Sequence, residues 1–265
     1  MPSFSVASYN VMANAYVQRW FYRRTPKLVL KPLWRTPAVT QRVASIGADL
    51  LCLQEVEPEM FAVLESRLTS LGYRAHYAPK RGNQPDGCAI FYREDGFELV
   101  ETRVVEYTDG AHGRANAGHI ALISWLRTAG RVIGVANTHL TWDPPGTAAA
   151  ARLGLRQTLE LLGEWRTMAL TAGGWLICGD LNATPESDVV AMFLRAKFQY
   201  AHAGLAGTYT CKVNDEIKMI DYIFFSPGFR AEPVDVLPLS QETILPSAAE
   251  PSDHLPIVAR LSWTD

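Results

Sequence analysis

The 265-residue sequence has little excess of either charge, because 25 basic side chains stand against 27 acidic ones. This balance excludes a global positive field that would hold a long polyanion, so any contact with nucleic acid should be short or confined to a local patch. Nowhere do 18 apolar residues follow one another, so no membrane-spanning helix is predicted. The first ten residues, MPSFSVASYN, lack the basic start and apolar stretch of a secretory signal. We therefore expect a cytoplasmic protein without membrane contact.

Cysteine is also scarce, and its four positions are widely spaced: Cys52, Cys88, Cys178 and Cys211. Three of them lie inside apolar runs, so we expect buried thiols in a reducing compartment rather than a disulfide framework. No Cys/His cluster has the spacing of a zinc site, and neither a GxxxxGK[ST] phosphate loop nor a GxSxG nucleophile elbow is present. These absences argue against a zinc protein, a P-loop nucleotide hydrolase and a serine hydrolase.

Short apolar runs rich in valine, isoleucine and aromatic residues dominate the sequence and predict strands. They are Phe4–Val11, Asp49–Val56, Cys88–Arg93, His119–Arg127, Arg131–Leu140, Trp175–Asn182, Ile220–Ser226 and Leu255–Trp263. Helices are predicted at Thr36–Ala48, Glu57–Leu71, Ala148–Leu170 and Ser187–Ala196, the last with Ser187 as its N-cap. The alternation lacks strict βαβ regularity, which favours a mixed α/β layer fold. Since no repeat or linker interrupts the chain, residues 1–265 are predicted to form one domain.

Polar side chains stand at the ends of most predicted strands: Asn10, Glu55, His139, Asp180, Asn182, Asp221, Asp253 and His254. Each one alone has a structural explanation. Asn10 could form a turn, Glu55 could start the next helix, and His139 could be a hydrogen-bonded core histidine. However, buried carboxylates are costly unless they are paired, hydrogen-bonded or bound to metal, and four of them border apolar runs. If they converge, Mg²⁺ together with substrate phosphate is the partner that suits oxygen donors.

The same residues lie in an ordered set of motifs that resembles the endonuclease/exonuclease/phosphatase superfamily, the DNase I-like fold. The motifs are SYN (8–10), LQEVE (53–57), DGCAIFYR (86–93), NTHL (137–140), GDLNATPES (179–187), IDYIFFS (220–226) and SDHLP (252–256). They run in family order and cover essentially the whole chain. The resemblance implies the α/β fold class. The expected architecture is a four-layer α/β/β/α sandwich, in which helices flank two mixed, mainly antiparallel sheets and the site lies at one rim.

The resemblance also implies a role for each residue of the set. Glu55 would be the principal Mg²⁺ ligand, with Asn10 beside it holding the metal or a phosphate oxygen; Mn²⁺ could substitute for Mg²⁺. Asp180 would orient or deprotonate the attacking water, and Asn182 would fix the phosphate. His254 would stabilise developing charge, oriented by either Asp221 or Asp253, and His139 would be a second imidazole that contacts phosphate or transfers a proton. These groups suit phosphoryl transfer, which needs a positioned water and charge neutralisation.

Finer features resemble the deadenylase branch, which includes the poly(A)-removing, nocturnin and Angel-like members. They imply that Asn116, Trp142, Pro144 and Tyr209 bind substrate, although Asn116 could equally form a turn, and Trp142 and Tyr209 could serve packing. The chain departs from the poly(A)-removing enzymes because residues 215–220 hold no aromatic side chain to stack on adenine. The function implied is a phosphoesterase acting on RNA 3′ ends or small nucleotides, by 3′–5′ cleavage or by removal of a 2′,3′-cyclic phosphate or 2′-phosphate.

Two other functions stay open, a lipid-headgroup phosphodiesterase and a catalytically silent binding module. The segment Trp20–Arg35 interleaves basic and aromatic residues, a pattern that suits a short RNA end or a solvated loop with buried aromatics. Since no partner-docking module is evident, we expect a monomeric catalytic domain with no obligate protein partner.

Overall fold

The computed structural model describes residues 2–109, 118–205, 207–213 and 216–264, and within them the strands form two six-stranded sheets and a two-stranded ribbon. The first sheet has the strand order β13-β14-β1-β2-β4-β3. Its strands are β1 (Ser3–Asn10), β2 (Leu50–Val56), β3 (Tyr73–Pro79), β4 (Gly87–Arg93), β13 (Phe229–Pro233) and β14 (Ile257–Trp263). The β1–β2 pair is parallel, whereas the other neighbours in this sheet are antiparallel.

The second sheet has the strand order β5-β6-β7-β8-β12-β9. Its strands are β5 (Glu98–Glu106), β6 (Ile120–Thr128), β7 (Arg131–His139), β8 (Gly174–Asp180), β9 (Gln199–Tyr200) and β12 (Asp221–Phe225). The β6–β7 pair is the antiparallel hairpin expected from the sequence, and the β7–β8 pair is parallel. The ribbon of β10 (Cys211–Val213) and β11 (Glu216–Lys218) lies beside the sheets.

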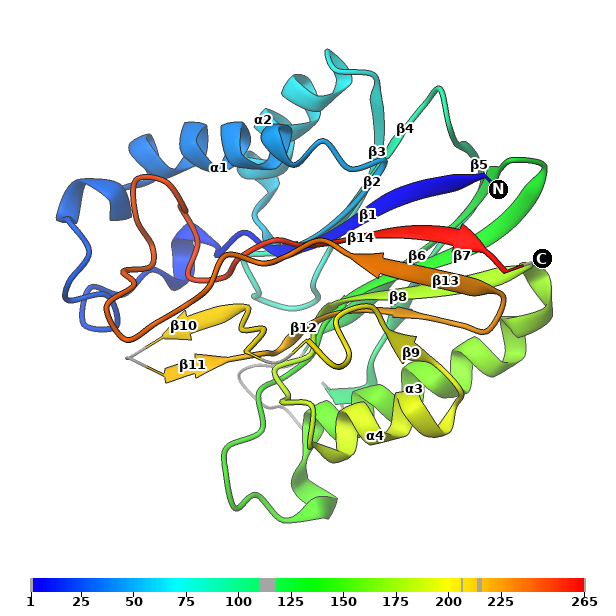
Figure 1. Cartoon of the computed structure of the whole chain (residues 1–265). Helices are drawn as coiled ribbons and strands as arrows, with labels where there is room; N and C mark the ends of the chain where they lie inside the picture. Colours follow the sequence, from blue (N-terminus) through cyan, green and yellow to red (C-terminus); the bar gives the residue numbers. More distant parts are fainter. Residues whose placement is uncertain (1, 110–117, 206, 214–215, 265) are drawn as a thin grey trace.

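Helices cover the outer faces of both sheets (Figure 1). On one side lie α1 (Pro32–Ile46) and α2 (Pro58–Thr69), and on the other lie α3 (Leu153–Met168) and α4 (Asp188–Arg195). Three apolar clusters fill the layers: one between the sheets, one under α1 and α2, and one under α3 and α4. The predicted α/β/β/α sandwich is therefore confirmed. Among the described residues, no helix is both long and apolar enough to cross a bilayer.

Central strands are apolar on both faces because both faces are covered. Successive side chains of a strand point to opposite faces, so Leu176 and Cys178 of β8 enter the core between the sheets while Trp175 and Ile177 pack toward the helices. All four cysteines are buried and free, as predicted. The side chain of Ser187 accepts a hydrogen bond from the Val190 amide at 3.3 Å and so caps α4 as expected.

The helix predicted at Thr36–Ala48 begins earlier, because Pro32 occupies the first turn of α1 and Pro37 lies inside the helix. Pro37 removes only the backbone hydrogen bond to the carbonyl of Leu33, and both residues are exposed, so water can solvate the carbonyl. Several strands escaped the prediction, namely β3, β5, β9, β10, β11 and β13. They are short or partly exposed, and polar or charged residues interrupt them, so they form no continuous apolar run.

Candidate active site

The strand ends that carry the predicted residues meet at one rim, at the end of the sandwich away from the two chain termini (Figure 1). Asn10 ends β1, Glu55 lies near the end of β2, and Asp180 ends β8. The side-chain amide of Asn10 donates to Glu55 Oε1 at 2.9 Å and to Asp180 Oδ2 at 3.0 Å. This one amide therefore links the reactive edges of the two sheets.

Local backbone geometry turns Glu55 toward this rim. The pairing of β2 with β4 shifts register between Leu53 and Val56, as at a β-bulge, and Glu55 adopts a left-handed φ of 56°. Met12 and Asn182 have similar values, 57° and 51°. A left-handed backbone at a residue other than glycine costs roughly 1–3 kcal/mol, and such strain clusters at functional sites. The Ala13 amide donates to Glu55 Oε2 at 2.8 Å and holds the carboxylate in place.

His254 is paired with Asp221, which answers the question that the sequence left open. Its Nδ1 lies 2.9 Å from Asp221 Oδ2, and its Nε2 lies 3.6 Å from Asp180 Oδ2. Burial alone would lower the pKa of His254, but the negative charges of Asp221 and Asp180 raise it well above its ordinary value. Conversely, burial raises the pKa of Asp180 to about 7, although His254 opposes that rise.

Asp253 has a different partner. Its Oδ2 accepts a hydrogen bond from the hydroxyl of Tyr22 at 2.7 Å, and its Oδ1 lies 3.4 Å from the hydroxyl of Ser252. Asp253 therefore ties the segment around Tyr22 to the site, next to His254 in the sequence. Of the two aspartates considered as partners of the imidazole, Asp221 makes that contact.

His139 lies on the other side of Asp180. Its Nε2 is 3.0 Å from the Nδ2 of Asn182 and 3.7 Å from Asp180 Oδ2, and its Nδ1 is 3.9 Å from Glu55 Oε1. Burial lowers the pKa of His139 well below its ordinary value, and the charge of Lys80 adds to that effect. The surroundings of the two histidines therefore favour different forms: the charged imidazolium at His254 and the neutral imidazole at His139.

Sequence reasoning missed several polar residues that support the site. Lys80 and Asp86 form a buried ion pair at 2.8 Å, and Lys80 Nζ lies 3.4 Å from His139 Nδ1. Arg35 is fully buried and donates to the carbonyls of Val11 and Met12, behind the site. Asp86 carried a signal that could have found it, since it precedes an apolar strand just as the recognised carboxylates border theirs.

A second buried histidine–aspartate pair was also missed. His119 Nδ1 lies 2.9 Å from Asp109 Oδ2, and Gln157 donates to the same oxygen at 2.7 Å. The ring of His119 stands edge-on to the ring of His139, with 6.1 Å between centroids. No sequence pattern indicated this pairing, because Asp109 lies outside the predicted strands and helices and Gln157 lies inside the helix predicted at Ala148–Leu170.

The donor set fits a hard divalent cation. Glu55 is largely enclosed near Asp86 and Asp253, and its pKa is raised by loss of solvent and by the charges of those two carboxylates. A cation at Glu55 would relieve this excess of negative charge. The side chain of Glu55 is 13% exposed while that of Asp180 is only 2% exposed, so Glu55 is the carboxylate that stays accessible. Ligand atoms of Asp180, Asp221 and His254 also lie within 4.8 Å of one another.

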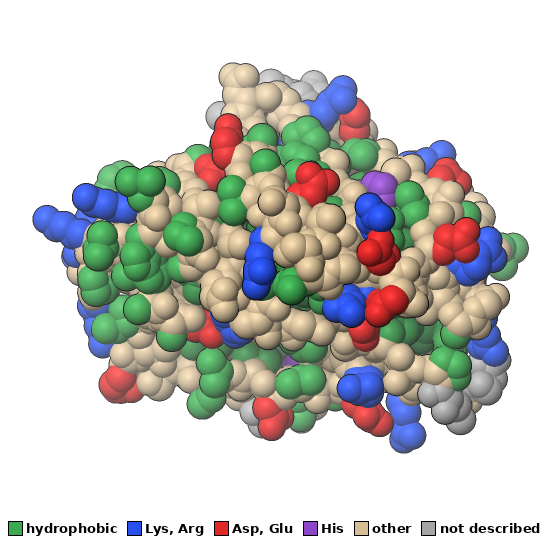
Figure 2. Space-filling view, turned by 90° about the horizontal axis from the view of Figure 1, so that it is seen from above, with side chains coloured by type: hydrophobic (Ala, Val, Ile, Leu, Met, Phe, Trp, Pro, Cys, Tyr) green, Lys and Arg blue, Asp and Glu red, His purple; other side chains and the backbone are tan. Residues whose placement is uncertain are grey.

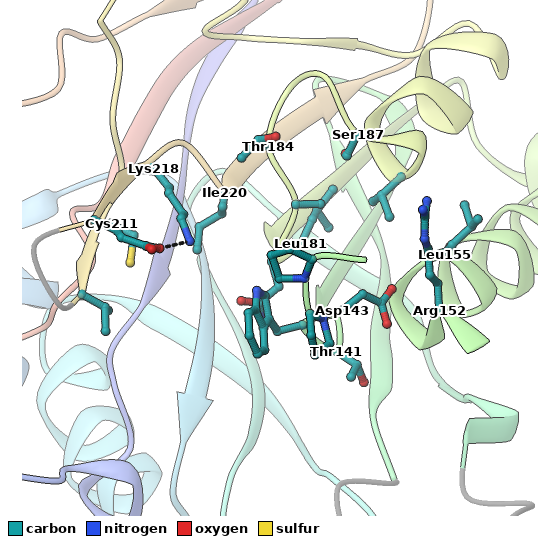
Figure 3. Close-up of a pocket in the computed structure, with 18 of the residues that line it drawn as sticks. Thr141, Asp143, Arg152, Leu155, Leu181, Thr184, Ser187, Cys211, Lys218 and Ile220 are labelled. Carbon is teal, nitrogen blue, oxygen red and sulfur yellow. Dashed lines mark ion pairs between the residues drawn. The ribbon is translucent and has the colours of Figure 1, made fainter. Parts of the chain in front are cut away.

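A cleft of about 780 Å³ opens beside these residues and is lined by Asn182 and His254. Trp142 and Pro144, two of the predicted substrate contacts, also line it. Figure 3 shows Cys211, Lys218 and Ile220 on one side of the cleft and Arg152, Leu155 and Ser187 on the other. The cleft therefore reaches the rim at Asn182 and His254.

The other two predicted substrate contacts are placed differently. Tyr209 is 40% exposed and lines a neighbouring cavity of about 300 Å³ rather than this cleft. Asn116 lies outside the described residues.

Comparisons with known proteins point to one family. A family model described as the Endonuclease/Exonuclease/phosphatase family matches residues 7–254. Protein angel homolog 2 of Homo sapiens is 31% identical over 209 residues, covering 74% of this chain and 38% of the relative. The CCR4-Not complex 3′-5′-exoribonuclease subunit Ccr4 of Candida albicans is 26% identical over 322 residues, covering 97% of this chain and 41% of the relative. The chain thus spans about two fifths of the length of these relatives.

The fold is similar to that of ANGEL2, a 2′,3′-cyclic phosphatase, solved in complex with adenosine-2′,3′-vanadate. The TM-score is 0.84 at 22% identity, over 98% of this chain and 95% of that chain.

Proposed function

The chain belongs to the endonuclease/exonuclease/phosphatase family, and from that premise we propose that it is a divalent-metal-dependent phosphoesterase that hydrolyses bonds at RNA 3′ ends. The observation that carries the proposal is the contact of Asn10 with both Glu55 and Asp180, beside the His254–Asp221 pair. The relatives support the substrate class, since one is named a 3′-5′-exoribonuclease and a structural neighbour is described as a 2′,3′-cyclic phosphatase.

We propose Mg²⁺ as the ion, held by Glu55 with Asn10 beside it. The bound ion would neutralise phosphate charge and activate water. Asp180 would hold the attacking water and accept its proton, and a pKa of about 7 suits a general base near neutral pH. The site's own hydrogen bonds keep this carboxylate in place, from Asn10 Nδ2 on one oxygen and the Asn182 amide on the other.

The remaining side chains would bind the phosphate as negative charge develops. His254 would donate through Nε2, since Asp221 orients its Nδ1 and favours the charged form. Asn182 and His139 would contact the phosphate as neutral groups, which leaves the ionisation of Asp180 undisturbed.

The side chains that line this cleft give no reason to expect selectivity for poly(A). Lys218 and Ile220 form the wall next to Asp221, and neither offers the aromatic face on which adenine would stack for roughly 1–3 kcal/mol. We therefore infer that the enzyme recognises the phosphate end of the RNA more than a run of adenines, with Trp142, Pro144 and Tyr209 as candidate contacts to the terminal nucleotides.

We also propose that residues 1–265 act as one catalytic domain in the cytoplasm, where buried free thiols stay reduced, and that catalysis needs no protein partner. The Ccr4 relative is named as a subunit of a complex, so the last point needs its own test. Sedimentation of the active protein as a monomer would support it, and activity only in a larger assembly would refute it.

The reaction itself is tested with 5′-labelled oligoribonucleotides that end in a 3′-hydroxyl, a 2′,3′-cyclic phosphate or a 2′-phosphate. With Mg²⁺, a ladder of shorter products indicates 3′–5′ cleavage, and a single mobility shift without shortening indicates removal of the terminal phosphate. Turnover of sphingomyelin or a phosphoinositide instead of RNA would refute the proposal in favour of a lipid substrate. Inactivity on every substrate, with no stabilisation by Mg²⁺, would favour a silent binding module.

A further inference from the structure

The segment of residues 17–35 carries positive charge without any acidic residue. It holds six arginine or lysine side chains, although the whole chain has a net charge of -2. Three of the six have structural roles: Arg19 donates to carbonyls of its own loop, Arg24 donates to the carbonyls of Gln241 and Glu242, and Arg35 is buried. Arg23, Lys27 and Lys31 are exposed and form no ion pair with any residue that the structure describes.

A second cavity, of about 310 Å³, lies against this segment. Its lining includes Trp20, Phe21, Arg23 and Leu245. Phe21 also lines the cleft beside His254, so the two hollows share one wall. Tyr22, the next residue, is fixed to the site through Asp253. The second cavity is therefore anchored to the candidate active site and adjoins its cleft.

Two aromatic rings at this place point away from the core. Trp20 is 60% exposed and Phe21 is 37% exposed, and their ring centroids are 5.9 Å apart. Large exposed aromatics beside unpaired cations are the elements of a binding surface for single-stranded nucleic acid, in which rings stack on bases and cations contact phosphates. Figure 2 shows basic and hydrophobic side chains gathered at the end of the molecule where this segment lies in Figure 1.

We propose that the cavity lined by Trp20, Phe21 and Arg23 binds the nucleotides of an RNA substrate that lie 5′ to the reacting end. The proposal rests on the proposed function, because it assumes that an RNA 3′ end occupies the cleft beside His254. The strand would leave that cleft across Phe21, place a base against Trp20, and set its phosphates beside Arg23 and Lys27. The site would thereby prefer an RNA chain over a free nucleotide.

A membrane surface is the competing occupant, because exposed apolar and basic side chains also suit anionic lipid. The shared wall favours RNA. A strand that leaves the cleft reaches the second cavity directly, whereas a flat bilayer would not enter a hollow between Phe21 and Leu245.

The test compares two RNA substrates with the same reactive 3′ end, a dinucleotide and a 12-mer. We expect the wild-type protein to show a kcat/KM at least about tenfold higher on the 12-mer, the size of effect that one stacked base can supply. In Trp20→Ala and in Arg23→Glu/Lys27→Glu, the ratio between the two substrates should fall toward one. Trp20→Phe, which keeps a ring, should retain most of the preference.

The charge control is Arg67→Glu/Arg166→Glu, which makes the same change in net charge on exposed positions of α2 and α3. This control should keep the wild-type ratio, and a fall equal to that of Arg23→Glu/Lys27→Glu would overturn the proposal. A ratio is used because damage to the fold lowers activity on both substrates together. Equal activity of the wild type on both lengths would also overturn the proposal, while leaving the proposed function intact.

A binding assay addresses the competing occupant. If Trp20→Ala loses binding to vesicles rich in phosphatidylserine and keeps the length preference on RNA, then the surface binds lipid and the proposal is wrong. Inactivity of the wild type on both RNA lengths would instead refute the proposed function, on which the proposal rests.

Discussion

Replacing Asp180 with asparagine should stabilise the metal-free protein at alkaline pH even though it destroys the proposed general base. Asp180 is only 2% exposed, and burial raises its pKa from an ordinary value of 3.8 to about 7. The folded state therefore holds the proton more tightly than the unfolded state does. Above both pKa values the ionised carboxylate destabilises the fold, by up to about 4 kcal/mol at pH 8, and this cost disappears near pH 4.

The substitution also damages hydrogen bonds. The Asp180 carboxylate accepts from the Asn182 amide at 2.8 Å and from Asn10 Nδ2 at 3.0 Å, and an asparagine amide can keep only one oxygen acceptor. The lost bond costs about 1–2 kcal/mol at every pH. Asp180→Asn should therefore be less stable than the wild type near pH 4 and more stable by about 2 kcal/mol at pH 8.

The measurement is urea unfolding in EDTA at pH 4, 6 and 8, followed by tryptophan fluorescence. Asp109→Asn is the matched control, because Asp109 is also buried but its pKa is lowered by its contacts with His119 and the Gly118 amide despite burial. A lowered pKa contributes stability above the unfolded value, so this control should lose more stability at pH 8 than at pH 4. A difference between wild type and Asp180→Asn that does not change with pH would refute the reasoning.

Two further substitutions test the geometry of the site. Asp221→Asn removes the main charge that raises the pKa of His254, so the histidine should titrate at lower pH. Turnover at pH 8 should then fall by on the order of a hundredfold or more. An unchanged pH–rate profile together with an unchanged NMR titration of His254 would contradict this. Gly179→Ala would place a Cβ 1.9 Å from the carbonyl oxygen of Thr138 on the paired strand. The denaturation midpoint should therefore drop by the equivalent of more than about 4 kcal/mol. A midpoint close to that of the wild type would show that β7 and β8 can separate.

Apolar runs predicted the central strands because those strands are buried on both faces, as β2 and β8 illustrate. The apolar pattern did not predict strands such as β5, because the exposed residues Glu98 and Glu101 interrupt the pattern in that strand. The antiparallel pairing of β5 with β6 is a tertiary contact, and it stabilises a strand that the local sequence alone does not favour. The order and register of strands likewise depend on pairings between distant segments, which local periodicity cannot reveal.

The convergence of the candidate site residues was predictable because each polar residue borders an apolar strand, where burying a charge is costly without a purpose. The supporting residues were not predictable in this way. Arg35 lies in a segment that interleaves basic and aromatic residues, and only the folded chain brings it under the carbonyls of Val11 and Met12. The choice of Asp221 over Asp253 as the partner of His254 also needed three-dimensional positions, since Asp253 is adjacent to His254 in sequence and yet bonds to Tyr22.

The central claim is that Glu55 holds a divalent cation at the rim where the two sheets meet. Its most direct test is to measure the thermal midpoint and RNA 3′-end hydrolysis against Mg²⁺ concentration for the wild type, Glu55→Gln and the control Glu59→Gln, an exposed residue in the first turn of α2. We predict that Mg²⁺ raises the midpoint and activates the wild type and Glu59→Gln with one apparent affinity. Glu55→Gln should show neither response, and a wild-type response to Mg²⁺ in Glu55→Gln would contradict the account.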